Sequence, residues 1–110
     1  MRILVDAMGG DRAPEEIVKG ACIASKDFGL DVILIGNEGK IKPYMNRIGC
    51  SLEIIHAEEV ITNDEQPVTA IRKKKESSIV KGLKLLKEGK VQAMVSAGST
   101  GALMAGGLFI

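Results

Sequence analysis

The sequence "SAGSTG", from Ser96 to Gly101, places hydroxyl side chains between glycines directly after an apolar run. Glycines this close together weaken a regular element, so a tight turn, close packing or a bound ligand should compensate for them. A helix that begins near Ser99 or Thr100 leaves its first amides unpaired at the positive end of the helix dipole, which suits phosphate or another oxyanion. A glycine turn in which one of these hydroxyls caps the helix explains the same pattern. The candidate anion-binding residues are Gly98, Ser99, Thr100 and Gly101.

A second glycine pair lies in "DAMGGD", from Asp6 to Asp11, after the first apolar run. Gly9 and Gly10 permit a close backbone approach or a positive φ, and the two aspartates bracket them. We expect these four residues to form the wall beside the first segment. Asp11 also suits the N-cap of the helix that follows. The segment lacks the dinucleotide fingerprint, and no lysine follows Gly101 as a Walker A loop requires.

A basic run precedes the helical pattern that starts at Ser77, and its residues are Arg72, Lys73, Lys74 and Lys75. Such a run is usually a solvated face. The basic run also suits an anion site inside a cleft, or a docking patch for an acidic partner. Half a positive charge at one helix end does not balance a phosphate dianion, so a phosphate site should recruit a lysine or arginine.

The metal-ligating side chains are few and scattered. His56 is the one histidine, and it fits either a structural role or that of a catalytic base at a strand end. Cys22 and Cys50 lie far apart and form no C-x-x-C pair, which argues against zinc. We therefore expect no metal site. We expect the two cysteines to be reduced, structural thiols, as in a cytoplasmic protein.

The composition is that of an ordinary globular domain, with 110 residues, 45% of them apolar and 26% charged. The net charge of +1 and the absence of Trp argue against a nucleic-acid partner. The start "MRILVDAMGG" is not a signal peptide, and no apolar run is long enough to span a bilayer. The apolar end "ALMAGGLFI" has no helix stop signal, so we interpret residues 1–110 as the N-terminal part of a single catalytic domain, truncated within a helix.

Four apolar runs of strand length must position these residues: "RILVD", "DVILIG", "SLEIIHA" and "VQAMVSA". Helical patterns lie between them, over 14–28, 37–48, a short stretch from 67, 77–89, and from about 99 onward. The first pattern places Ile17, Ala21, Ala24 and Phe28 on one face, and Pro43 leaves the start of the second uncertain. This alternation predicts a three-layer α/β sandwich with a mostly parallel sheet. Ligands then bind at the carboxyl ends of the strands, where Asp6, Gly36, His56 and Ser96 fall.

Taken in order, the motifs "DAMGGD", "HAEEVI", "PVTAIR", "RKKKESS" and "SAGSTGALMAGGLF" resemble the PlsX-type phosphate acyltransferases of bacterial phospholipid synthesis. The resemblance extends from Met1 to Ile110. It implies transfer of a fatty acyl group from an acyl-carrier-protein thioester to inorganic phosphate, giving acyl phosphate. It also implies a fold similar to that of phosphate acetyltransferases and isocitrate dehydrogenase-like enzymes.

The resemblance further implies a homodimer without metal or nucleotide cofactor, associated with the membrane at its periphery. Acyl carrier protein and inorganic phosphate are the partners that it implies. It names no catalytic residue within this chain. Two alternatives stay open: an enzyme that uses acyl-coenzyme A as donor, and a module that binds the carrier protein without catalysis.

Overall fold

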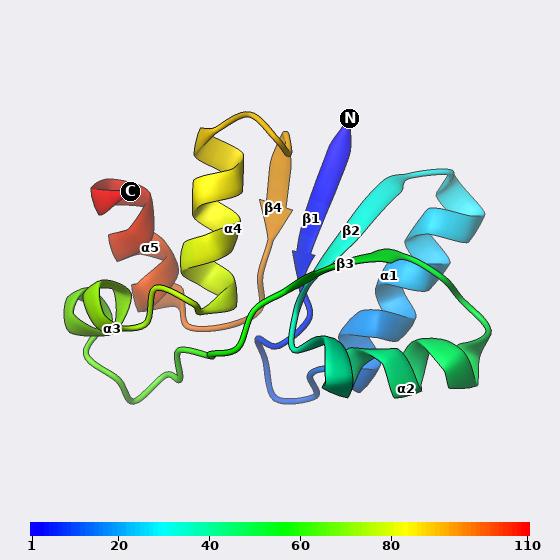
Figure 1. The fold of residues 1–110 in the computed structure, drawn as a ribbon, viewed down its shortest axis with the longest axis horizontal. Helices are drawn as coiled ribbons and strands as arrows, with labels where there is room; N and C mark the ends of the chain where they lie inside the picture. Colours follow the sequence, from blue (N-terminus) through cyan, green and yellow to red (C-terminus); the bar gives the residue numbers. More distant parts are fainter.

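The computed structural model describes all of residues 1–110, and strands alternate with helices along the chain (Figure 1). The strands are β1 (Arg2–Asp6), β2 (Asp31–Gly36), β3 (Glu53–His56) and β4 (Ala93–Val95). The helices are α1 (Glu15–Phe28), α2 (Glu38–Ile48), α3 (Pro67–Lys73), α4 (Ser78–Lys87) and α5 (Thr100–Phe109). All the elements predicted from the sequence are present, although β4 is shorter than expected. None of the helices combines the length and apolar character that crossing a membrane requires.

The four strands form one sheet in the order β3-β2-β1-β4, and every pair is parallel. Val5 of β1 lies opposite Val95 of β4, and Asp6 lies opposite Ile35 of β2. The carboxyl ends of all strands therefore meet at one edge, low in Figure 1, and the loops that follow β1 and β4 come together there. The predicted α/β class is confirmed, with a sheet that is wholly parallel.

Helices cover both faces of the sheet. Val32 and Leu34 of β2 pack with α1 and α2, whereas Ile33 and Ile35 of the same strand face the side on which Leu85 and Leu86 of α4 pack. The alternation follows from the two-residue period of a strand. A third apolar cluster joins α3, α4 and α5 to Ile61 and contains no strand residue. The layers are therefore α1 and α2, the sheet, and α4 with its neighbours.

The first helical pattern buries a different stripe from the one expected. Val18, Ala21 and Cys22 are the buried residues of α1, while Phe28 is 75% exposed. Both stripes have helical spacing and share Ala21, so periodicity alone does not choose between them. The choice is made by α2, whose Ile41 and Met45 belong to the same cluster as Val18 and Cys22.

The start of α2 is set by its cap. The Asn37 side chain accepts a hydrogen bond from the Lys40 amide at 3.2 Å, and the helix begins at Glu38 although Pro43 lies inside it. Proline removes one backbone donor, whose acceptor would be the carbonyl of Gly39 in the first turn. One lost bond near a capped end is therefore tolerated.

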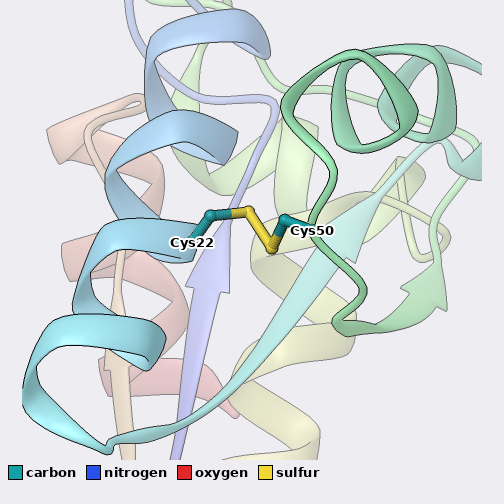
Figure 2. Close-up of a disulfide and its surroundings, with 2 residues drawn as sticks. All are labelled: Cys22 and Cys50. Carbon is teal, nitrogen blue, oxygen red and sulfur yellow. A yellow bond between two sulfur atoms is a disulfide. The ribbon is translucent and has the colours of Figure 1, made fainter.

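Cys22 and Cys50 form a disulfide that ties α1 to the segment after α2 (Figure 2). The prediction of two reduced thiols is therefore wrong. The two cysteines are 28 residues apart in sequence. Because α1 and α2 pack on the same face of the sheet, the Cα atoms of Cys22 and Cys50 lie 6.2 Å apart. Closing a loop of this length stabilises a fold by roughly 3 to 4 kcal/mol in the chain-entropy account.

Candidate functional site

A cavity of about 580 Å³ opens at the carboxyl edge of the sheet. Three segments line it: Met8–Asp11 after β1, Val60–Asn63 between β3 and α3, and Ala97–Thr100 before α5. The first and last segments come from the two glycine motifs of the sequence, so the fold brings these two predicted site segments together. The 60–63 segment was not predicted as part of the site, although Val60 and Ile61 end the "HAEEVI" motif, which begins at the last residue of β3.

The two glycine loops touch through their backbones. A Cβ atom on Gly9 would lie 2.5 Å from the nitrogen and 2.6 Å from the Cα of Gly98, so only glycine fits there. Gly10 adopts a φ of +101°, a conformation that side chains disfavour. The glycines of the first loop thus have both of the roles that the sequence suggested, close approach and positive φ.

A buried aspartate joins the same two loops. Asp6 is 1% exposed, and its Oδ1 accepts from the Met8 amide at 3.0 Å. Its Oδ2 accepts from the Ser96 hydroxyl at 2.8 Å, and Ser96 Oγ in turn accepts from the Gly98 amide at 3.1 Å. Asp6 therefore organises the loops from beneath and does not line the cavity. Because the Gly98 amide is already bonded, Gly98 contributes close packing rather than a free donor.

The first turn of α5 provides unpaired donors. Ser99 is the N-cap, and its hydroxyl accepts from the Ala102 amide at 3.2 Å. The amides of Ser99, Thr100 and Gly101 donate to no protein atom. Of these residues, Ser99 and Thr100 line the cavity, whereas a Cβ on Gly101 would lie 2.8 Å from Cγ of Pro67. Gly101 therefore belongs to the contact between α5 and α3.

The adjoining wall, formed by the first glycine loop, provides further donors. The amides of Gly9, Gly10 and Asp11 form no hydrogen bond within the chain, and all three residues line the cavity. α1 has no side-chain cap, and its N-cap residue is Pro14, so the alternative of Asp11 as N-cap is wrong. Asp11 instead places an exposed carboxylate on the wall.

The cation expected beside a phosphate is not among the lining residues. No lysine or arginine lines the cavity. Lys74 donates from Nζ to the Val60 carbonyl at 2.9 Å and to Oε1 of Glu65 at 2.7 Å. These bonds fix the loop that carries the third wall of the cavity, Val60–Asn63. Arg72, Lys73 and Lys75 are exposed and outside the cavity.

The loop between β3 and α3 is held by charged hydrogen bonds. The Lys74 ammonium, with help from the Thr62 amide, holds the pKa of Glu65 below its ordinary value. The Thr62 hydroxyl donates to Asp64 at 2.7 Å and lowers the pKa of that carboxyl as well. Both acids therefore stay ionised in mildly acidic solution, and the loop keeps its anchor there.

His56 has a structural role. Its Nδ1 accepts from the Glu38 amide at 3.1 Å, which places the ring proton on Nε2, next to Oε1 of Glu58. Both ring nitrogens are thus occupied, and His56 does not line the cavity. Its carbonyl accepts from the Lys81 ammonium at 2.6 Å. Of the two roles that the sequence left open, the structure supports the structural one.

Comparison with known proteins adds an independent finding. Residues 1–110 match the family model described as "Fatty acid synthesis protein". The chain is 54% identical over 109 residues to the phosphate acyltransferase of Thermoanaerobacter pseudethanolicus, covering 98% of this chain and 32% of that protein. It is 53% identical over 114 residues to the phosphate acyltransferase of Clostridium botulinum, covering 100% of this chain and 34% of that protein. The chain thus spans about a third of the length of the curated relatives it matches.

Proposed function

Because the chain belongs to the fatty acid synthesis protein family, we propose that it takes part in acyl transfer from a carrier-protein thioester to inorganic phosphate. A phosphate oxygen attacks the thioester carbonyl, the tetrahedral intermediate collapses, and the carbon–sulfur bond breaks. The products are acyl phosphate and the free thiol of the carrier protein. The observation that carries the proposal is the cavity at the two glycine loops, where five lining residues have amides without a protein acceptor: Gly9, Gly10, Asp11, Ser99 and Thr100.

This reaction needs little proton transfer from the protein. Phosphate is already an anionic nucleophile at neutral pH, and a thiol leaving group has a pKa of about 8.5. A cavity without a histidine is consistent with that requirement. What the reaction does need is a place where two anionic reactants are held together and the developing oxyanion is stabilised.

The unpaired amides suit that task. In the proposal, the amides of Ser99 and Thr100 at the start of α5 donate to phosphate or to the oxyanion, and those of Gly9, Gly10 and Asp11 complete the adjoining wall. One such donor contributes about 3 kcal/mol to a transition state.

Two further groups of residues have supporting roles. Asp6 acts as a positioning residue, because it holds both loops through Met8 and Ser96. The exposed cations Arg72, Lys73 and Lys75 are proposed contacts for the acidic carrier protein, outside the cavity. A homodimer at the cytoplasmic membrane surface belongs to the same proposal, which for these points rests on the family resemblance.

Phosphate binding is tested with a charge placed in the first turn of α5. An aspartate at this position of a helix is favourable for the helix dipole, so Thr100→Asp should fold normally but repel an anion. We expect calorimetric titration with inorganic phosphate to show at least a tenfold weaker affinity for Thr100→Asp than for Thr100→Asn. Thr69→Asp is the matched control, because Thr69 is exposed in the first turn of α3 and does not line the cavity. Equal affinities for all variants would place the anion elsewhere.

Turnover is tested separately. The chain is incubated with phosphate and either an acyl-carrier-protein thioester or acyl-coenzyme A, and acyl phosphate is trapped with hydroxylamine. Product from the carrier-protein thioester supports the proposal, and product from acyl-coenzyme A alone identifies the other donor. Phosphate binding without product from either donor would assign these 110 residues a binding role only. A binding role is the second candidate function, because the chain spans 32% of the length of this relative.

A further inference from the structure

The Cys22–Cys50 disulfide lies in the wall of a second cavity. This cavity has a volume of about 530 Å³ and opens between the end of α1 and the segment after α2. Both cysteines line it, and so do the polar residues Ser25, Lys26, Asp27 and Ser51. It shares no residue with the cavity of the candidate functional site. The volume is that of a small-molecule site, roughly 300 to 1,000 Å³. A small ligand that enters the cavity therefore meets the disulfide directly.

The two cysteines are not equally accessible. Cys22 is 6% exposed and belongs to the apolar cluster between α1, α2 and the sheet. Cys50 lies in the segment after α2, where it is half-buried at the edge of that cluster (Figure 2). The rate of thiol–disulfide exchange depends on which sulfur an incoming thiolate can reach. An incoming thiolate therefore attacks Cys50, and Cys22 is the leaving group.

One free charge of each sign lies beside the disulfide. Lys26 is four residues after Cys22 and therefore lies on the same face of α1. Asp27 follows it, and both residues are exposed, line the cavity and form no ion pair within the chain. A neighbouring ammonium stabilises a thiolate, so Lys26 favours both the attacking thiolate and the Cys22 thiolate that leaves. Asp27 offers a carboxylate to an amino group of the ligand.

We infer that this disulfide cavity, with Cys22, Lys26, Asp27 and Cys50 in its wall, is a site of thiol–disulfide exchange with a low-molecular-weight peptide thiol that carries an amino group. The thiolate of the ligand attacks Sγ of Cys50, a bond forms between these two sulfurs, and the Cys22–Cys50 bond breaks with its electron pair left on Cys22. A second ligand thiolate then attacks the ligand sulfur of the mixed disulfide and releases the Cys50 thiolate. Two ligand thiols become one ligand disulfide, and their two protons pass through water to the two cysteine thiolates. This inference does not depend on the proposed reaction.

The attacked sulfur is identified on the unmodified chain. The chain is incubated with reduced glutathione, free thiols are blocked with N-ethylmaleimide, and both labels are located by mass spectrometry of its peptides. We expect glutathione on Cys50 and maleimide on Cys22, in about tenfold excess over the reverse arrangement, because Cys50 is the accessible sulfur. Equal amounts of the two arrangements would overturn the inference, because attack on an unfolded chain gives that result.

The amino group is tested with two ligands that differ in nothing else. Glutathione carries a free ammonium group, and N-acetylglutathione lacks it while keeping the thiol. We expect the adduct at Cys50 to form about threefold faster with glutathione, which is the size of one exposed ion pair. Asp27→Asn should remove this difference. Glu16→Gln should retain it, because Glu16 is exposed in α1 but lies outside the disulfide cavity. Equal rates for the two ligands with the unmodified chain would overturn the inference.

The leaving group is tested with Lys26→Gln. This variant should lower the rate about threefold for both ligands, because the Cys22 thiolate loses its neighbouring charge. Lys40→Gln is the matched control, since Lys40 is exposed in α2 and lies outside the disulfide cavity. Rates that Lys26→Gln leaves unchanged, or that Lys40→Gln lowers equally, would show that the cavity does not direct the exchange and would also overturn the inference.

Discussion

The two ends of the sheet differ in how completely they are covered. At the β2–β3 end, every residue from Val32 to Gly36 is buried, α1 and α2 lie over one face, and the Cys22–Cys50 disulfide joins the α1–α2 layer (Figure 2). At the β4 end, Val95 and most of the outer side of α5 are exposed. The difference teaches that the two ends of one sheet bury their apolar residues to different extents, according to the helices packed over each.

The candidate site lies where these two ends meet. The Gly9 loop begins the covered end, because it leads into α1, and the Gly98 turn begins the open end, because it leads into α5. The close approach of the two loops and the Asp6–Ser96 hydrogen bond connect the ends at the carboxyl edge. The geometry of the cavity therefore depends on both ends at once.

The largest effect is expected from breaking the covered end. Reduction with dithiothreitol should lower the free energy of unfolding by roughly 3 to 4 kcal/mol, because the cross-link no longer restricts the unfolded chain. Hydrogen exchange should accelerate more in α1 and α2 than in α5. Cys50→Ser is the control, since its stability should not respond to reductant. Equal acceleration everywhere would mean that the two ends unfold as one unit.

The next effect comes from separating the two loops. Gly9→Ala places a Cβ within 2.6 Å of two backbone atoms of Gly98, so the loops must move apart. We expect a loss of about 3 kcal/mol in chemical denaturation, together with loss of phosphate binding. Gly20→Ala in α1 has free space around it and should instead stabilise the chain by about 0.5 to 1 kcal/mol. A neutral Gly9→Ala would show that the loops do not need their close contact.

A smaller effect is expected from Ser96→Ala, which removes the hydrogen-bonded link and leaves the loops in place. The substitution deprives Oδ2 of Asp6 and the Gly98 amide of their partner. The expected cost is about 2 kcal/mol, because buried polar groups are left unpaired. Ser51→Ala, at an exposed position of the covered end, should have no effect on the same denaturation curve.

The smallest effect concerns the third wall and depends on pH. Lys74 lowers the pKa of Glu65 in the folded chain. The ion pair therefore stabilises the loop fully above the ordinary glutamate pKa of about 4.3. This stabilisation is lost as the pH falls through the lowered pKa of Glu65 in the folded chain. Glu65→Gln should therefore melt slightly below the unmodified chain at pH 7 and match it in strong acid. Glu76→Gln is the control, since Glu76 is exposed and forms no ion pair. A difference that persists unchanged in strong acid would contradict the ion pair as its cause.

Features that depend on neighbouring residues were predictable from the sequence. The short, continuous apolar run of "DVILIG" predicts a strand buried on both faces, and the hydroxyl of Ser99 predicts a helix start, because both depend on interactions within a few residues. The same local logic identified the glycine loops and placed Asp6 at the carboxyl edge. The family resemblance, which covers the whole chain, agrees with the comparisons.

Features that depend on which distant surfaces meet were decided only by the tertiary structure. The Cys22–Cys50 disulfide, the bonding of Lys74 to the third wall and the contact of Gly9 with Gly98 each join segments whose separation in sequence gives no signal of contact. Short-range periodicity fixes which elements form, because it reflects interactions within one turn or one strand. The packing of α1 on α2, and of one loop on another, is a competition among whole surfaces, and only the assembled fold resolves it.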